Sequence, residues 1–141
     1  MDAECMRMSR LVNDMLLLAS SDAGTWSVSV KQINVDTLLI TLYETYEPIC
    51  TKHNIALELD IADISYPILY SDPERITQVL SIFMDNAVHH SDKSSNIQIK
   101  TSLTAKTITF YIVDHGLGIA EQDKPYIFDR FYCADKSHTN K

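Results

Sequence analysis

Two alternating apolar runs near the end of the chain constrain its fold more than any other feature. Residues 96–103 are NIQIKTSL and residues 107–114 are TITFYIVD, and apolar side chains recur at alternate positions in both runs. Such alternation is typical of strands with one buried face. The short connection at Ala105 and Lys106 predicts a tight turn. The two runs are therefore expected to form an antiparallel hairpin.

The segment before the hairpin has the clearest helix-start signal in the chain. Asp72 is a good N-cap, and Pro73 suits the first helical position because it has no N–H to leave unpaired. Apolar residues then recur at spacings of three and four, which predicts a helix with one wide apolar face. That face is expected to contain Ile76, Val79, Leu80, Phe83, Met84 and Ala87. Asn86, His89 and His90 are expected to lie together on another face.

Further elements are predicted upstream of this helix. Residues 26–33 resemble a short strand, and Asp36 is expected to cap a helix that runs to about Lys52. The inner face of that helix is expected to contain Leu39, Leu42, Tyr46 and Ile49. Residues 55–61 and 66–71 are predicted strands. Because strands are grouped rather than alternating strictly with helices, the pattern favours an α+β fold, a two-layer α/β sandwich.

One more helix is predicted at the N-terminus, over residues 3–21, with Gly24 as a C-terminal stop. Its apolar stripe contains Met8, Leu11, Val12, Met15, Leu18 and Ala19. A stripe of this kind needs a partner surface. It packs either on the rest of the chain or on the same helix of a second copy, and both alternatives stay open from the sequence.

Charge and composition exclude some classes of function. The net charge of −7 argues against a nucleic-acid partner, because binding phosphates needs clustered Lys and Arg. No apolar run approaches the roughly 20 residues of a membrane span, and no secretory leader is recognisable. The three cysteines, Cys5, Cys50 and Cys133, are far apart and are not spaced like a zinc site. These features are typical of a cytoplasmic protein.

Residues 114–119, DHGLGI, contain two of the chain's three glycines, directly behind the second predicted strand. The carboxylate of Asp114, in a concave and poorly solvated site, would suit an exocyclic amine such as that of adenine. Gly116 and Gly118 permit positive φ and allow a flat ring to approach the backbone. Asn86 offers an amide oxygen, which is a good neutral ligand for Mg²⁺. A plain glycine turn and a solvated helix face would explain the same residues without a ligand.

Three segments together resemble the sensor histidine kinases of two-component systems. Residues 78–91, QVLSIFMDNAVHHS, resemble their N-box, and residues 113–137, VDHGLGIAEQDKPYIFDRFYCADKS, resemble their G1 and F boxes. Residues 7–24 look like the second helix of the dimerisation and histidine-phosphotransfer hairpin. The resemblance implies the Bergerat (GHKL) ATPase sandwich, preceded by one N-terminal helix. Residues 1–24 would end the hairpin, and residues 25–141 would form an incomplete catalytic and ATP-binding domain.

The resemblance implies an ATP site whose adenine end lies in residues 114–119. Asp114 matches the acid that binds the adenine amine. Gly116 and Gly118 match the glycines under the base, and Ile119 follows in the same box.

At the phosphate end, the resemblance implies Asn86 as the Mg²⁺ ligand. His89 and His90 match positions near the phosphates. Phe128 and Phe131 match the aromatic residues at the root of the ATP lid, although core packing would explain them equally well. No residue of the chain is assigned a catalytic role.

The sequence departs from the family pattern in several places. Ile82 stands where a second Asn or an acid is usual, and Cys133 stands where an Arg commonly follows the F-box aromatics. No second glycine-rich box occurs before Lys141, and no histidine has the phosphoacceptor context. The domain is therefore expected to be truncated. Its exposed edge and lone N-terminal helix are expected to be covered in a homodimer or a swapped oligomer.

Three functions follow from these comparisons of motifs. The first is the ATP-binding part of a sensor histidine kinase, whose parent passes the γ-phosphoryl group of ATP to a His and then to a response regulator. The fragment would be the cytoplasmic portion of a parent that can be membrane-bound, and it would be inactive by itself. The second is a degenerate kinase-like dimerisation or binding module. The third is an anti-sigma-type serine kinase, which would not need the N-terminal helix.

Overall fold

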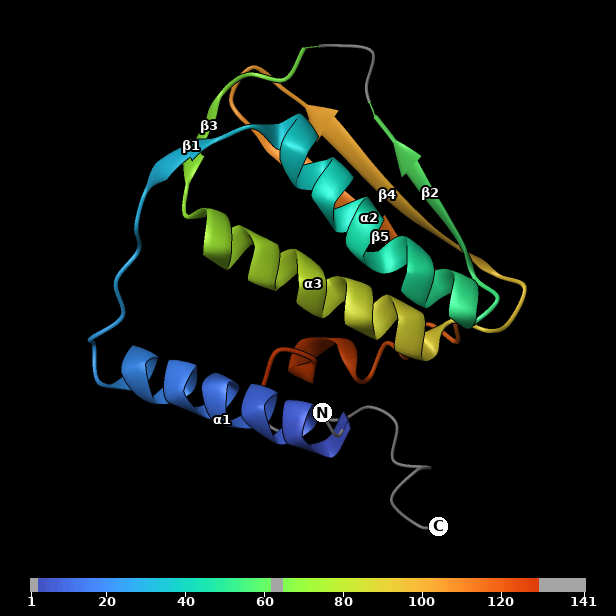
Figure 1. The fold of residues 1–141 in the computed structure, drawn as a ribbon, viewed down its shortest axis with the longest axis horizontal. Helices are drawn as coiled ribbons and strands as arrows, with labels where there is room; N and C mark the ends of the chain where they lie inside the picture. The colour runs from blue at the N-terminus through green and yellow to red at the C-terminus, as the bar shows by residue number, and fades with distance from the viewer. Residues whose placement is uncertain (1–2, 62–64, 130–141) are drawn as a thin grey trace.

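Two helices cover one face of a three-stranded sheet in the computed structural model, which describes residues 3–61 and 65–129 (Figure 1). The elements, in chain order, are α1 (Ala3–Asp22), β1 (Lys31–Ile33), α2 (Val35–Lys52), β2 (Ala56–Asp60), β3 (Leu69–Ser71), α3 (Pro73–His90), β4 (Asn96–Leu103), β5 (Ile108–Val113) and the 3₁₀ turn η1 (Lys124–Tyr126). Helices α2 and α3 form one layer and the sheet forms the other. The predicted two-layer α/β sandwich is confirmed.

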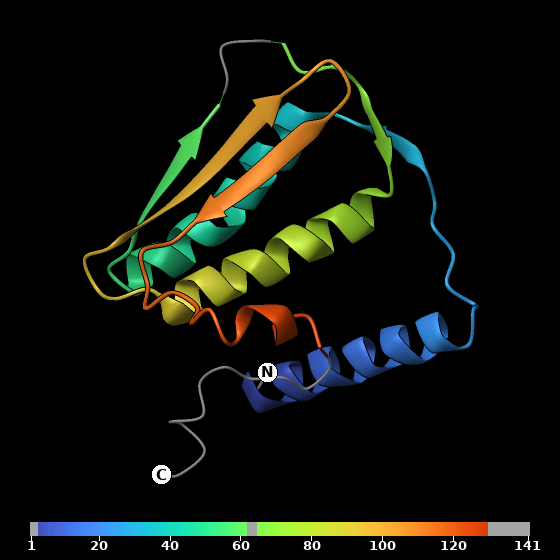
Figure 2. The same ribbon diagram turned by 180° about the vertical axis from the view of Figure 1, so that it is seen from behind.

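The sheet has the order β2-β4-β5 and is of mixed type (Figure 2). Strands β4 and β5 form the predicted antiparallel hairpin, in which Ile99 pairs with Ile112, and the Thr104 N–H donates to the Thr107 carbonyl across the turn at 2.9 Å. Strand β2 runs parallel to β4, with Leu57 opposite Ile97. Strands β1 and β3 form a separate antiparallel pair. Only the last three residues of the predicted strand over 26–33 are extended in a sheet.

The core lies between α2, α3 and the sheet. Its largest fully buried side chains are Leu39, Met84, Ile97, Ile99, Val35 and Cys50. Because strands β2 and β4 are adjacent and parallel, the chain must cross over between them, and α3 makes this crossover on the helical face. This topology places the C-terminal end of α3 next to the loop that follows β5.

Helix α3 begins where the sequence predicts. The Asp72 carboxylate accepts hydrogen bonds from the N–H groups of Glu74 at 3.1 Å and Arg75 at 3.3 Å. The predicted cap of α2 at Asp36, by contrast, is wrong. The N-cap is Asn34, whose Oδ1 accepts from the Thr37 N–H at 3.1 Å, and Asp36 lies inside the first turn. Asn34 has the extended backbone that a cap requires.

The apolar face of α3 is narrower than predicted. Leu80, Met84 and Ala87 are buried against the sheet. Val79 and Phe83, in contrast, remain 49% and 45% exposed. They turn away from the sheet because they lie on the flank of the helix rather than at the centre of its buried stripe.

Helix α1 does not join the core. Met8, Leu11 and Met15 are 65%, 51% and 60% exposed. In both views α1 lies outside the sandwich, on the far side of α3 from the sheet. The alternative in which this stripe packs on the rest of the chain is therefore wrong for the described residues. No helix in residues 3–61 and 65–129 combines the length and apolarity needed to cross a membrane.

The segment between α1 and β1 is fastened to the first turn of α3. The Ser29 N–H donates to Asp72 Oδ2 at 2.9 Å, and the guanidinium carbon of Arg75 lies 4.1 Å from the centroid of the Trp26 ring. Asp72 thus caps α3 with one oxygen and holds the linker with the other. Arg75 adds a cation–π contact at the same place.

Candidate functional site

The loop after β5 rests on the last carbonyl group of α3. A Cβ at Gly116 would lie 2.3 Å from the His90 carbonyl oxygen, a distance that no real side chain tolerates. Of the two glycines, Gly118 uses the positive φ that glycine permits, at +73°, and Gly116 does not. Gly116 is needed because the backbone of α3 approaches it closely. The contact brings two separate predicted motifs together.

Asp114 follows the last residue of β5 and shapes the same loop. Its Oδ1 accepts a hydrogen bond from the Gly116 N–H at 3.0 Å, which closes a tight Asx-type turn. His115 Nδ1 lies 3.1 Å from the Asn96 carbonyl, which can only accept, so this ring nitrogen donates and ties the loop to β4. Asp114 is exposed, so the poorly solvated carboxylate that a concave site would provide is not seen among the described residues.

Exposed apolar side chains occur in this loop and in the segment that follows it. Leu117 is 90% exposed and Ile119 is 49% exposed. Phe128, beyond the 3₁₀ turn η1, is 83% exposed. The other predicted aromatic residue of this region, Phe131, lies outside the described residues, as does Cys133.

Helix α3 presents its predicted site residues on two neighbouring stripes. With 3.6 residues per turn, residues 82, 86 and 90 form one stripe, and residues 81, 85 and 89 form the next. Asn86 is exposed, and within the described chain its amide makes no hydrogen bond. The His89 and His90 rings touch edge to face, with centroids 4.8 Å apart. Asn86, His89 and His90 therefore lie at the same end of the helix, at spacings of three and four residues.

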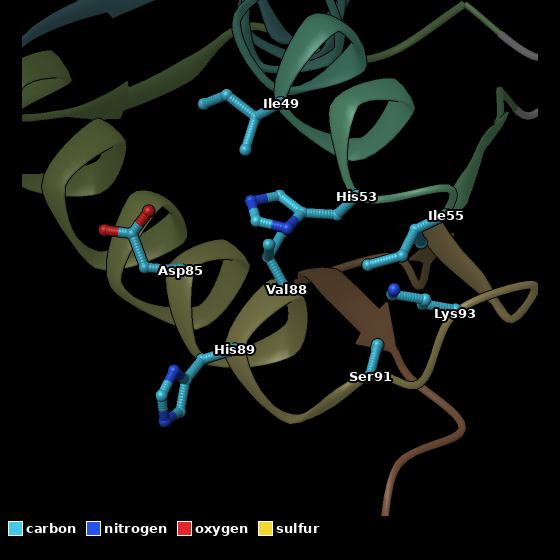
Figure 3. Close-up of a pocket in the computed structure, with 8 residues that line it drawn as sticks. All are labelled: Ile49, His53, Ile55, Asp85, Val88, His89, Ser91 and Lys93. Atoms are coloured by element: carbon cyan, nitrogen blue, oxygen red, sulfur yellow. The ribbon is translucent and has the colours of Figure 1, made fainter.

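His89 borders the region between α3 and α2, although its ring points away from α2. There the two helices border a cleft of about 380 Å³ (Figure 3). Its lining residues are Ile49, His53, Ile55, Asp85, Val88, His89, Ser91 and Lys93. Apart from His89, the sequence motifs did not single out any of these residues as functional.

Above this cleft, a tyrosine hydroxyl joins α2 to α3. Tyr46 Oη lies 2.8 Å from Asp85 Oδ1 and 3.0 Å from the Ser81 carbonyl oxygen. Burial, followed by the hydrogen bond to Asp85, raises the pKa of Tyr46 to about 12. The sequence placed Tyr46 on the inner face of α2 but gave no sign that its hydroxyl would have a partner on the helix that contains Asn86.

The side chains at the end of α3 are compatible with a Mg²⁺ ion that binds together with a phosphate ligand. Within the described residues, no three His, Cys, Asp or Glu side chains gather as a metal-binding group. The Asn86 amide oxygen is a single accessible neutral donor. Mg²⁺ commonly takes only one or two protein ligands and completes its shell with phosphate oxygens and water, so one such donor is compatible with it.

Comparisons with known proteins agree with this arrangement. Residues 71–141 match the family described as histidine kinase-, DNA gyrase B-, and HSP90-like ATPase. The signal transduction histidine-protein kinase ArlS of Staphylococcus haemolyticus is 29% identical over 136 residues, which are 96% of this chain and 29% of that protein. ArlS of Staphylococcus aureus strain USA300 is also 29% identical, over 30% of its length. The chain thus spans less than a third of these relatives.

Solved structures of histidine kinases have the same fold. Acinetobacter baumannii AdeS superposes with a TM-score of 0.74 at 23% identity, over 87% of this chain and 60% of that one. ThkA in complex with the response regulator TrrA gives 0.76 at 22% identity, over 92% and 37%. Full-length ShkA in complex with AMPPNP gives 0.75 at 24% identity, over 83% and 25%. At these identities the likeness establishes the fold alone. Together with the family match, it shows that the chain belongs to the histidine kinase-, DNA gyrase B- and HSP90-like ATPase family and is related to its sensor histidine kinases.

Proposed function

We propose that this chain is the ATP-binding part of a sensor histidine kinase, which transfers the γ-phosphoryl group of ATP to a histidine in two-component signalling. The contact between Gly116 and His90 supports this proposal most directly, because it seats the G1-like loop on the end of the N-box-like helix. The family match over residues 71–141 includes both motifs. Since the chain spans only 29% of the relative ArlS, phosphotransfer belongs to a longer protein.

The loop 114–119 forms the adenine end of the proposed site. The Gly116 N–H donates a hydrogen bond to Asp114 Oδ1. The other carboxylate oxygen, Oδ2, would therefore accept the hydrogen bond from the adenine amine. Guanine has a carbonyl at that position, and facing it would leave two acceptors unpaired, at a cost of about 1–3 kcal/mol. Gly118, with its positive φ, and Ile119 border the ring together with Gly116.

The end of α3 forms the phosphate end of the proposed site. Asn86 would hold Mg²⁺ through its amide oxygen, and His89 and His90 would lie near the phosphates, with Phe131 at the root of a lid. The metal supplies positive charge that neutralises the triphosphate. Ile82, one turn before Asn86 and 52% exposed, adds no ligand on this stripe. Metal affinity is therefore expected to depend strongly on how Asn86 is oriented.

Nucleotide binding is tested by a thermal shift of the 141-residue chain. Wild type is expected to be stabilised by ATP with Mg²⁺ and far less by GTP, because a ligand that binds only the native state raises its stability. Asp114→Asn keeps the acceptor for the Gly116 N–H but lacks the carboxylate, so it should lose the ATP shift without losing stability. No shift of wild type by any adenine nucleotide would contradict the proposal. It would favour a degenerate binding module, for which exposed Val79, Ile82 and Phe83 offer an apolar surface.

By itself the chain is proposed to be inactive in autophosphorylation. None of its five histidines lies on α1 or is directly followed by the acid expected in a phosphoacceptor motif. Incubation with radiolabelled ATP and Mg²⁺ should therefore give no acid-labile phosphohistidine. Stoichiometric labelling would overturn this part of the proposal and leave nucleotide binding intact.

The proposed partners follow from the same assignment. Residues 1–24 would belong to the dimerisation hairpin and residues 25–141 to the ATP-binding domain, and the exposed stripe of α1 supports a homodimer or a swapped oligomer. The longer parent would pass the phosphoryl group to a response regulator, as the reported complex of ThkA with TrrA suggests. We place this portion of the parent in the cytoplasm. With a net charge of −7, nucleic acid is not a proposed partner.

A further inference from the structure

One buried hydroxyl connects α2 to two points of α3. Tyr46 is 4% exposed, and its Oη is within hydrogen-bond distance of both the Ser81 carbonyl oxygen and Asp85 Oδ1. A phenol has one proton, and both partners accept, so the two bonds share that proton. Ser81 and Asp85 are one helical turn apart. The hydroxyl therefore contacts α3 at both ends of one helical turn, and not at a single side chain.

This contact lies at the edge of the cleft between α2 and α3, because Asp85 is one of the residues that line it. One turn further along, Ile49 and Val88 already border the cleft of about 380 Å³ (Figure 3). In the part of the chain that the structure describes, no other hydrogen bond joins α2 to α3. Among the described residues, the last turn of α3, beyond Asp85, therefore makes no hydrogen bond to α2.

The helical turn that Tyr46 contacts ends at Asp85, which directly precedes Asn86. Asp85 faces α2, so its neighbour Asn86 falls on the adjacent stripe, in line with His90. The His90 carbonyl is in turn pressed against Gly116. Tyr46 on one side and Gly116 on the other thus bracket the segment of α3 that contains the proposed metal ligand.

We infer that Tyr46 is a positioning residue for the phosphate end of the nucleotide site: its hydroxyl fixes the turn of α3 that presents Asn86. This inference rests on the proposed function. The hydroxyl keeps its proton at neutral pH, since burial and Asp85 raise the pKa of Tyr46 to about 12. The aromatic ring packs in the core whatever the hydroxyl does. Removing only the oxygen therefore separates positioning from packing.

The test measures ATP dissociation constants with Mg²⁺ and with EDTA, and takes the ratio of the two for each protein. Tyr46→Phe is expected to reduce the gain in affinity due to Mg²⁺ roughly three- to tenfold, the equivalent of one hydrogen bond, with little change in EDTA. Asp85→Asn keeps an acceptor oxygen for Tyr46 and should retain the wild-type ratio. Asp85→Ala removes that oxygen from an exposed side chain and leaves only the Ser81 carbonyl for the hydroxyl, so it should change the ratio in the same direction as Tyr46→Phe but by less, which keeps the test valid if Tyr46→Phe is poorly folded.

Tyr66→Phe is the matched control. It also removes one part-buried tyrosine hydroxyl, which is hydrogen-bonded to Thr101 on the sheet. It should leave the Mg²⁺ ratio unchanged even if it lowers stability. An unchanged ratio in Tyr46→Phe and Asp85→Ala, or an equal loss with and without Mg²⁺, would overturn the inference alone. Failure of wild type to bind ATP would overturn the proposed function, and the inference with it.

Discussion

The backbone carbonyl of His90 occupies the space that a side chain at Gly116 would need. A Cβ at Gly116 would lie 2.3 Å from the carbonyl oxygen and 3.0 Å from the carbonyl carbon. The first glycine of the loop is therefore fixed by contact within the protein, before any ligand is considered. The second, Gly118, is fixed by its φ of +73° and has open space around it. Substitution should therefore destabilise the protein for different reasons at the two positions: a steric clash at Gly116 and backbone strain at Gly118.

Gly116→Ala is expected to displace the loop from the end of α3. The new methyl group meets backbone atoms that cannot rotate away, so we expect a loss of about 1–3 kcal/mol in the free energy of unfolding. Because the displaced loop includes Asp114, the affinity for ATP should fall as well. Urea unfolding and an ATP titration measure the two effects. Wild-type stability in Gly116→Ala would show that the contact with His90 is not maintained in solution.

Gly118→Ala is expected to cost only the strain of a left-handed backbone, about 1 kcal/mol. Gly24→Ala is its matched control, since Gly24 has φ +69° and, like Gly118, has no atom within 4 Å of the place where a methyl group would lie. Both variants should lose similar stability in urea. Only Gly118→Ala should also weaken ATP binding. An equal effect of both on ATP affinity would argue against a role of Gly118 in the nucleotide site.

The fold was predictable where the signal is local. Asp72 and Pro73 identify the start of α3, and the alternation before and after Lys106 identifies the hairpin, because cap and turn chemistry depend on a few adjacent residues. The parallel pairing of β2 with β4 was not predictable, since those strands meet only after α3 has crossed between them. The cap of α2 was assigned two residues too late because Asn34 and Asp36 are both good cap residues.

The site was predictable only in part. The motifs identified the loop after β5 and the end of α3, and the structure brings these together through Gly116 and His90. The exposure of Asp114 was missed, because burial depends on which segments cover a loop and not on the loop itself. The role of Tyr46 was missed for a related reason. A tyrosine in an apolar stripe indicates core packing, and only the crossing of two helices shows what its hydroxyl contacts.

The pH dependence of stability should reveal the double role of Asp72. The hydrogen bond from the Ser29 N–H, with those from the N–H groups of Arg75 and Glu74, lowers the pKa of the Asp72 carboxyl below its usual 3.8. A depressed pKa in the folded state stabilises the protein fully above the unfolded value, and this stabilisation is lost as the pH falls through the folded value. The contribution should therefore be constant at neutral pH and decline progressively in acid, as the pH passes the unfolded value of 3.8 and then the lower folded value.

Asp72→Asn keeps one oxygen for the N-cap of α3 but removes the charge together with the oxygen that accepts from the Ser29 N–H. The difference in unfolding free energy between wild type and Asp72→Asn should be constant near neutral pH and should narrow in acid. Glu58, whose pKa is also lowered, chiefly by the hydrogen bond from Gln98, is present in both proteins and cancels from the difference. A difference that widens as the pH falls would contradict the assignment.

Arg75→Ala should release the linker between α1 and the sandwich. Trp26 is the only tryptophan of the chain and is 37% exposed beneath the Arg75 guanidinium, so its fluorescence reports on this contact. We expect red-shifted emission, faster quenching by acrylamide, and a loss of about 0.5–1 kcal/mol in stability. Arg10→Ala, which removes the same charge from exposed α1, should change none of these. Unchanged emission in Arg75→Ala would mean that Trp26 does not stack on Arg75 in solution.

The exposed stripe of α1 predicts self-association in solution. Its apolar side chains recur at helical spacing, and Leu11 and Met15, one turn apart, are 51% and 60% exposed. Burying two such side chains against a second copy contributes about 3 kcal/mol, equivalent to roughly a 100-fold change in a dissociation constant. Wild type should therefore sediment as a dimer or larger at micromolar concentration. Leu11→Glu combined with Met15→Glu should shift it to monomer.

The control for that experiment lies on the same helix. Ser9→Glu combined with Asn13→Glu adds the same charge at the same spacing, on exposed positions that lie on another face of α1. It should leave the sedimentation coefficient unchanged, because it places no charge within the stripe. If both double variants dissociate alike, repulsion by net charge is the cause and the stripe is not the interface. If wild type is already a monomer, α1 is left exposed to solvent in the isolated chain, and the proposed dimer is wrong.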